Sequence, residues 1–153
     1  MPTEKIMEFV KDTTEIISDK VGELKEDIWG EEQKLIVNEF KENSIAKVSS
    51  ILENINNSNV TFDKSGFKLS GMEVSLGLPP EIKTEFTVEK QIPVEDRKNI
   101  LESVKDNQII RIILNCLFKA QDYYEKIKFG NFKLESIEIN LGLIPGINLK
   151  FSK

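Results

Sequence analysis

The chain contains an internal duplication, and this feature restricts its fold more than any other. Residues 67–86 read FKLSGMEVSLGLPPEIKTEF and residues 132–151 read FKLESIEINLGLIPGINLKF, so ten of twenty aligned positions are identical at an offset of 65. The upstream segments 36–45 and 100–109 also match once a one-residue gap is allowed. A repeat of this kind indicates that one supersecondary unit occurs twice. We therefore predict two related halves, and we expect them to be arranged with pseudo-twofold symmetry.

Each copy of the repeat ends in two extended segments, and the first of these changes its alternation part-way. In the first copy Phe67 and Leu69 alternate with polar residues, and the apolar positions resume at Met72 with the opposite parity. The second copy makes the same change between Leu134 and Ile137. One extra residue in a period of two predicts a β-bulge, which bends and twists a strand. We expect bulges near residues 70–71 and 135–136, and return strands over residues 82–90 and 147–151.

Each copy begins with a helical segment, which we place at residues 31–56 and 95–127. Both segments share a Lys-acid-Asn-x-Ile pattern, with its Asn at Asn43 and Asn107. We predict continuous helices, and the alternative is a kink or restart at each Asn, because Asn is a weak helix former and a good N-cap. The first segment carries apolar residues on one side, at Val37, Phe40, Ile45, Val48, Leu52 and Ile55.

The segment 109–120, which reads IIRIILNCLFKA, is too apolar for an ordinary surface helix. Nine of its twelve residues are apolar, so a helix here must be covered on more than one side. We expect the sheet to cover one side, and the N-terminal helix or a second subunit to cover another. Cys116 is interpreted as a buried structural thiol. The predicted core residues are Ile110, Ile113, Leu114 and Leu117.

Residues 1–30 lie outside the duplication and predict one long amphipathic helix. A mainly apolar seam recurs at alternating spacings of three and four, which is the period of a coiled coil, at Met7, Val10, Thr14, Ile17, Val21, Leu24 and Ile28. One interpretation is that this helix docks on its own domain. The other is that it binds a protein partner or a second copy of the chain, because a helix this long exceeds the span of a small sheet. The candidate partner-binding residues are Val10, Ile17, Val21, Leu24, Ile28 and Trp29.

Together these elements predict an α+β fold in a single domain spanning residues 1–153. The domain would consist of a long N-terminal helix (1–30), a first αββ unit (31–90) and a second αββ unit (91–153). The two hairpins are expected to join into a four-stranded antiparallel sheet with helices on one face, because each hairpin has one apolar face to bury.

The composition argues against several classes of chemistry. The chain has no His and one Cys, which excludes His-based acid–base catalysis, Cys₂His₂ zinc sites and an intramolecular disulfide. No glycine-rich phosphate-binding motif is present. Glu73 and Glu138 recur in both copies, but alternation places them on the face opposite the apolar one, where solvated carboxylates are favoured over an acidic site. We therefore expect no enzyme activity, no metal and no cofactor.

Charge and hydropathy limit the partners and the location. The net charge is −5 and Lys residues are scattered among Glu, which disfavours nucleic acid as a partner. The longest apolar stretch is interrupted by Arg111 and Asn115 and is far shorter than the roughly 20 residues of a membrane span. The first residues do not resemble a secretory signal, and one Cys fits a reducing compartment. We predict a cytoplasmic protein with no membrane span.

The two strand segments, FKL followed by EVSLGL at 67–78 and FKL followed by EINLGL at 132–143, resemble part of a known family. They are similar to the small helix-plus-hairpin domains that occur with peptidases in bacterial conflict systems, the trypsin-co-occurring and Pepco domains. This chain differs in carrying two units and a separate N-terminal helix. The resemblance implies a non-enzymatic partner of a defence effector, and it transfers no catalytic residue.

Two functional hypotheses follow. The first is a non-catalytic protein-interaction module, such as an adaptor, an inhibitor or an oligomeric scaffold. The alternative is a module that binds a small apolar ligand or lipid in a cavity between the sheet and the helices. An enclosed cavity of several hundred Å³ between these layers would favour the alternative.

Overall fold

The computed structural model describes residues 34–41, 44–77, 79–127 and 130–153, and the predicted helix at 1–30 lies outside these ranges. Residues 34–40 are helical. The remaining elements, in chain order, are α2 (Ile45–Asn56), α3 (Asn59–Lys64), β1 (Phe67–Ser75), β2 (Glu81–Val88), α4 (Val94–Ser103), α5 (Gln108–Ile127), β3 (Lys133–Gly142) and β4 (Gly146–Ser152). The described residues therefore form an α+β fold.

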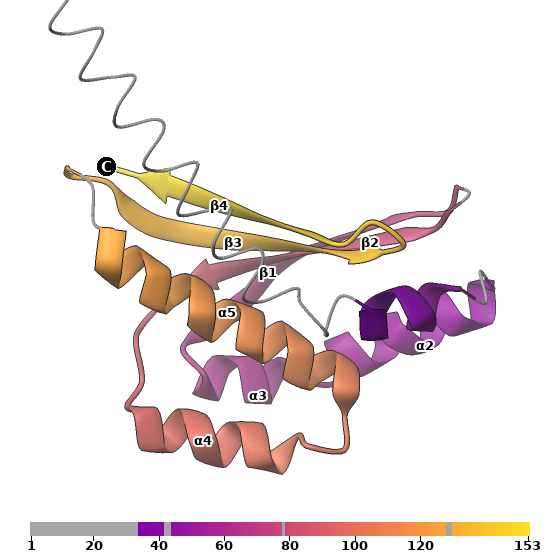
Figure 1. The fold of residues 1–153 in the computed structure, drawn as a ribbon, viewed down its shortest axis with the longest axis horizontal. Coiled ribbons are helices and arrows are strands. Elements are labelled where there is room, and N and C mark those ends of the chain that lie inside the picture. The colour runs from indigo at the N-terminus through magenta and orange to yellow at the C-terminus, as the bar shows by residue number, and fades with distance from the viewer. Residues whose placement is uncertain (1–33, 42–43, 78, 128–129) are drawn as a thin grey trace, which may run out of the picture.

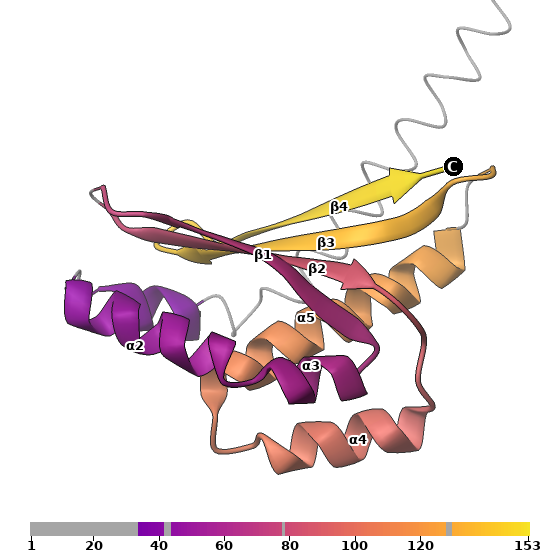
Figure 2. The ribbon, with the colours of Figure 1, turned by 180° about the vertical axis from the view of Figure 1, so that it is seen from behind.

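The four strands make one antiparallel sheet in the order β1-β2-β3-β4. The helices lie together on one face of this sheet, as two opposite views show (Figures 1 and 2). The predicted four-stranded antiparallel sheet with helices on one face is confirmed. Its apolar face is directed toward the helices because β2 alternates, with Ile82, Thr84 and Phe86 fully buried between more exposed neighbours.

Both predicted bulges are present. The register of β1 against β2 shifts between Leu69 and Gly71, and the register of β3 against β4 shifts between Leu134 and Ser136. The two positions correspond at the offset of 65 residues, so the inserted residue in each pattern has the same structural consequence. After each bulge the apolar side chains return to the helix-facing side of the sheet.

The expected pseudo-twofold symmetry is wrong for the sheet. A twofold axis that exchanges the hairpins would need β1 beside β3, or β2 beside β4, at the sheet centre. The central neighbours are instead β2 and β3. Because β1 and β3 are both antiparallel to β2, they run in the same direction. The second hairpin is therefore displaced from the first by two strand positions across the sheet.

Helix α5 forms the centre of the core, and the four predicted core residues Ile110, Ile113, Leu114 and Leu117 are all 0% exposed. The helix packs against β3, and α2 and α4 contact it from the helical layer. These two helices therefore cover part of α5, and the N-terminal helix that was also predicted to cover it lies outside the described residues. Cys116 is buried on α5, as expected.

The two predicted continuous helices are each interrupted, so the restart alternative is the correct one. Helix α4 ends at Ser103 and α5 begins at Gln108, and the backbone N–H of Arg111 donates to the carbonyl of Asn107. In the first copy Ser44 is extended and its hydroxyl accepts from the N–H of Lys47 at 3.1 Å, which caps α2. A capped restart shifts the helical phase, and Ile45, predicted for the apolar side, is 73% exposed.

Candidate functional site

The two hairpin turns lie at the same end of the sheet, because β1 and β3 run in the same direction (Figures 1 and 2). Large apolar side chains are exposed there. Leu76 follows β1 and is 69% exposed, and Ile144 lies in the β3–β4 turn and is 84% exposed. Leu143 adds a third exposed apolar side chain next to Ile144. We call Leu76, Leu143 and Ile144 the turn-end residues.

Helix α2 begins at this same end of the molecule, as both ribbon views show (Figures 1 and 2). Its first residue is the exposed Ile45. Single exposed apolar residues are common on proteins, but several at one end of a sheet are typical of a contact surface. No charged residue occurs between Leu76 and Pro80 or between Leu141 and Ile147, so both turns are uncharged.

The edge strand β1 is the second apolar feature. Met72 and Val74 share the helix-facing side of the sheet with Leu69, because they stand opposite Thr84 and Ile82 of β2. Met72 is nevertheless 39% exposed and Val74 is only partly buried. In the part of the chain that the structure describes, β1 pairs with β2 alone, so its second edge has no strand beside it.

The opposite face of the sheet is polar. Glu73 stands opposite Lys83, and Glu138 stands opposite Glu85. Glu138 also accepts a hydrogen bond from the side-chain amide of Asn148 at 3.1 Å. The predicted position of Glu73 and Glu138 on the face away from the core is confirmed. Among the described residues, no group of three or more Cys, Asp or Glu is arranged to hold a metal ion.

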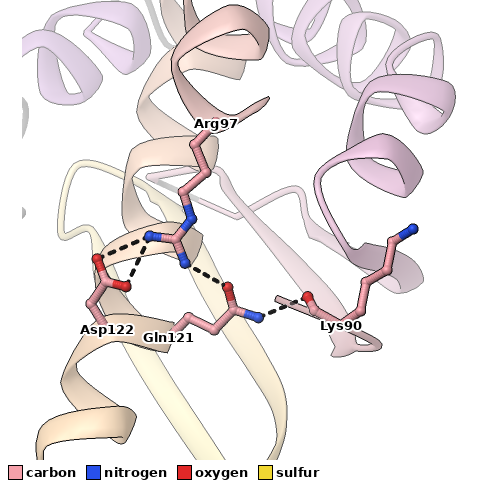
Figure 3. Close-up of polar contacts among 4 residues, drawn as sticks. All are labelled: Lys90, Arg97, Gln121 and Asp122. Atoms are coloured by element: carbon pink, nitrogen blue, oxygen red, sulfur yellow. Dashed lines mark hydrogen bonds and ion pairs between the residues drawn. The ribbon is translucent and has the colours of Figure 1, made fainter. Parts of the chain in front are cut away.

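The most extensive side-chain network fixes α4 to α5 (Figure 3). The Nη1 atom of Arg97 donates to both carboxylate oxygens of Asp122 at 2.8 and 3.0 Å. Its Nη2 atom donates to Oε1 of Gln121 at 3.0 Å, and Nε2 of Gln121 donates to the carbonyl of Lys90 at 2.9 Å. The guanidinium lies 4.8 Å from the centre of the Phe118 ring. Arg97 therefore joins α4 to α5, and Gln121 joins α5 to the segment after β2.

This network stabilises the packing of the fold. The Arg97 side chain is only 9% exposed, and its cation is neutralised by Asp122 and stacked on an aromatic ring. Gln121 is buried and uses both ends of its amide. These contacts join parts of the fold to one another, so the arrangement binds α4 and the segment after β2 to the central helix.

Two hollows bear on the ligand-binding hypothesis. A groove of about 610 Å³ lies between α2 and the α4–α5 connection, and most of its lining is polar. Asn54 and Asn107 bridge it with two reciprocal amide hydrogen bonds of 2.8 Å. A second hollow of about 340 Å³ lies between α5 and the sheet, and Val88, Leu134 and Tyr124 line it together with Lys90, Lys133 and Glu125. The larger hollow lies in the helical layer, and its polar lining does not suit an apolar ligand.

The six predicted partner-binding residues, Val10 to Trp29, lie outside the described residues. The turn-end residues and the β1 edge therefore form the candidate site that the structure adds. The sequence carries a signal for these residues, because both turns, at 76–80 and 141–146, contain apolar residues and no charge. Within the described ranges, no helix is both long and apolar enough to cross a membrane.

Comparison with known proteins found no matching family model, no similar curated protein and no similar solved structure.

Proposed function

We propose that the protein is a non-catalytic protein-interaction module, built from two tandem αββ units and acting as an adaptor or oligomeric scaffold. The observation that carries the proposal is the exposure of Leu76, Leu143 and Ile144 at one end of the sheet. An apolar surface of this kind gains free energy when a partner covers it, by about 25 cal/mol for each Å² removed from water. The polar outer face and the buried Arg97 network offer no comparable surface.

The proposal includes the N-terminal segment as a second contact. Val21 and Leu24 belong to a seam that a coiled-coil partner or a second copy would cover. A cytoplasmic location and a role beside a bacterial defence effector follow from the single Cys and from the family resemblance, and both remain proposals. Nucleic acid is not expected as a partner because the net charge is −5.

The test is capture of a partner by the tagged full-length chain in cells of its source organism, followed by quantification of the captured protein. Ile144→Asp places a carboxylate on the turn end and should reduce capture at least about tenfold, as expected for a contact residue. Val60→Asp is the matched control, because Val60 is 65% exposed on α3, away from the turns. Equal capture by the wild type, Ile144→Asp and Val60→Asp would refute the role of the turn end.

A second arm tests the N-terminal segment. Replacing Val21 and Leu24 together with Asp should abolish whichever interaction depends on the predicted seam, because a buried unpaired carboxylate is costly. Far-ultraviolet circular dichroism and the unfolding midpoint would show that the described fold is intact. Retention of full partner binding by this double variant would show that the seam is not a binding surface.

The alternative function, binding of a small apolar ligand, has one observation in its favour. The hollow of about 340 Å³ beside Val88, Leu134 and Tyr124 reaches toward the space between α5 and the sheet. A fluorescent fatty-acid probe tests it directly. Saturable binding that Leu134→Trp removes would support this alternative over the interaction module.

A further inference from the structure

We propose that copies of this chain associate head to tail, with β4 of one copy pairing with β1 of the next as an antiparallel strand. This inference deepens the proposed function by naming the partner, a second copy of the same chain. It depends on three observations: the sequence equivalence of the two hairpins, their displacement by two strands across one sheet, and the residues that this displacement would bring together.

The junction between the two hairpins is the template. Strand β2 pairs with β3 in a continuous antiparallel register from Glu81 opposite Gly142 to Thr87 opposite Ser136. In the repeat, β4 is the equivalent of β2 and β1 is the equivalent of β3. The outer edge of β4 therefore corresponds to the edge of β2 that pairs with β3, and the outer edge of β1 corresponds to the edge of β3 that pairs with β2. In the described residues neither outer edge has a neighbouring strand.

Transferring the register by 65 residues specifies the new pairing completely. On the helix-facing side every pair is apolar on both strands, because β4 and β1 each direct their apolar residues to that side. The pairs, with the β4 residue first, are Ile147 with Leu76, Leu149 with Val74, and Phe151 with Met72. This pairing would cover Met72 and Leu76, which are 39% and 69% exposed in the single chain.

The polar side of the sheet supports the same register. The transferred register places Lys150 directly opposite Glu73 of the next copy. Both side chains are exposed in the single chain. The equivalent internal pair is Glu85 opposite Glu138, two like charges. Directly opposed side chains of opposite charge stabilise an antiparallel pair, whereas like charges destabilise it. The junction between copies is thus better matched in charge than the internal junction on which it is based.

The β1 bulge does not obstruct this pairing. Bulges commonly protect an edge strand by twisting it away from further pairing. In β3, however, the bulge lies between Leu134 and Ser136, and β3 still pairs with β2 from Ser136 onward. The equivalent stretch of β1 begins at Gly71, after its own bulge. No Pro occurs in β1 or β4, so each backbone retains the N–H groups that a new ladder requires.

Head-to-tail pairing uses two different edges. An open assembly of any number of copies therefore ends in one unpaired β4 edge and one unpaired β1 edge. Such a heterologous contact produces an open chain of copies unless the rotation between them closes a ring. Sheet twist rotates adjacent strands by about 20–25°, so successive four-stranded copies would be turned by about 90°. Association is therefore expected to increase with protein concentration rather than to stop at a symmetric dimer.

Sedimentation velocity of the full-length chain, from low to high micromolar concentration, measures this association. Lys150→Glu should weaken it about tenfold, because it places two carboxylates opposite each other. Glu73→Lys alone should weaken it similarly, and the double variant Lys150→Glu with Glu73→Lys should restore it. Lys68→Glu is the matched control, since Lys68 is an exposed lysine on β1 before the bulge and outside the proposed pairing.

A cysteine experiment distinguishes head-to-tail pairing from the two symmetric alternatives. Directly opposed residues on antiparallel strands have Cβ atoms about 4.5–5.5 Å apart, close to the separation of a disulfide. Glu73→Cys and Lys150→Cys proteins are therefore mixed under a mild oxidant. A disulfide between the two variants supports the proposal. Dimers of Glu73→Cys alone would indicate β1–β1 pairing, dimers of Lys150→Cys alone would indicate β4–β4 pairing, and either result overturns it.

The proposal also fails if the wild-type chain is monomeric throughout the concentration series, or if restoration by the double variant is absent. These failures differ from failure of the proposed function. A monomeric chain that captures another protein, and loses it on Ile144→Asp, keeps its interaction function and excludes only self-assembly. A chain that neither associates nor captures a partner contradicts both.

Discussion

Strands β1 and β3 occupy equivalent positions in the repeat, yet their environments differ. Ile137 and Ile139 of β3 are 0% exposed, whereas the equivalent Met72 of β1 is 39% exposed and Val74 is only partly buried. Both strands alternate correctly and both carry a bulge at the same place. The difference is that β3 has a neighbour on each side and packs against α5, whereas β1 has one neighbouring strand among the described residues. The same pattern therefore gives a core strand in one copy and a partly exposed edge strand in the other.

The helical layers of the two copies differ in a related way. In the first copy, the segment 34–40 buries Ile36 and Phe40, which are 0% and 1% exposed. In the second copy, the only buried residue of α4 is Arg97. The segment 34–40 is thus attached to the core by buried apolar side chains, whereas α4 combines the partly buried Ile100 and Leu101 with the Arg97–Asp122 ion pair. Substitutions at equivalent positions of the two copies test both the difference between β1 and β3 and the difference between the helical segments.

The largest difference in stability is expected when the glycines that precede β1 and β3 are replaced by Ala. Gly66 and Gly130 both have a positive φ, of 92° and 59°. A Cβ on Gly66 would lie 2.2 Å from the carbonyl oxygen of Lys90, whereas a Cβ on Gly130 would meet nothing within 4 Å. Gly66→Ala should therefore destabilise the protein by about 3–5 kcal/mol, and Gly130→Ala by about 1 kcal/mol. Urea unfolding followed by circular dichroism measures both, and equal losses would contradict the close approach at Gly66.

Truncation of equivalent strand residues tests the contrast between β1 and β3 directly. Ile137→Ala removes a fully buried side chain and should cost about 2–4 kcal/mol, because it leaves a cavity in the core. Met72→Ala should cost less than about 1 kcal/mol in dilute protein, since the side chain is already 39% exposed. The unfolding midpoints must be measured where the chain is monomeric. A cost for Met72→Ala equal to that of Ile137→Ala would show that β1 is a core strand.

A smaller loss of stability than at Ile137 is expected at the ion pair of the second copy. Arg97→Ala should destabilise the protein by about 1–3 kcal/mol, because the buried Gln121 loses the donor to its Oε1 atom. The loss of stability is reduced because the Asp122 side chain is 49% exposed and can be hydrated when Arg97 is absent. Lys98→Ala on the exposed side of α4 is the control and should change stability by less than about 0.5 kcal/mol. Faster amide hydrogen exchange confined to α4 in Arg97→Ala would locate the effect.

Local sequence patterns were sufficient to predict the features that depend only on neighbouring residues in the chain. Alternation with one inserted residue predicted both bulges, and the apolar segment 109–120 predicted the central helix. The helix boundaries were less well predicted. A run of helix-compatible residues does not reveal that one helix stops within it and that a capping residue starts another. Ser44 and Asn107 each begin a new helix at a point where the periodicity alone favoured continuation.

The sequence by itself determined the two helix–hairpin units, the bulges, the face of each strand that is apolar and the absence of His chemistry. These properties follow from side-chain period and from residue identity, and both are local. Only the tertiary structure decided the strand order, and with it which copy of the repeat would lie at an edge. The strand pattern that the two copies share does not reveal that distinction, because it depends on how many neighbours a strand acquires. The exposed β1 edge and the turn-end residues are therefore consequences of position in the sheet.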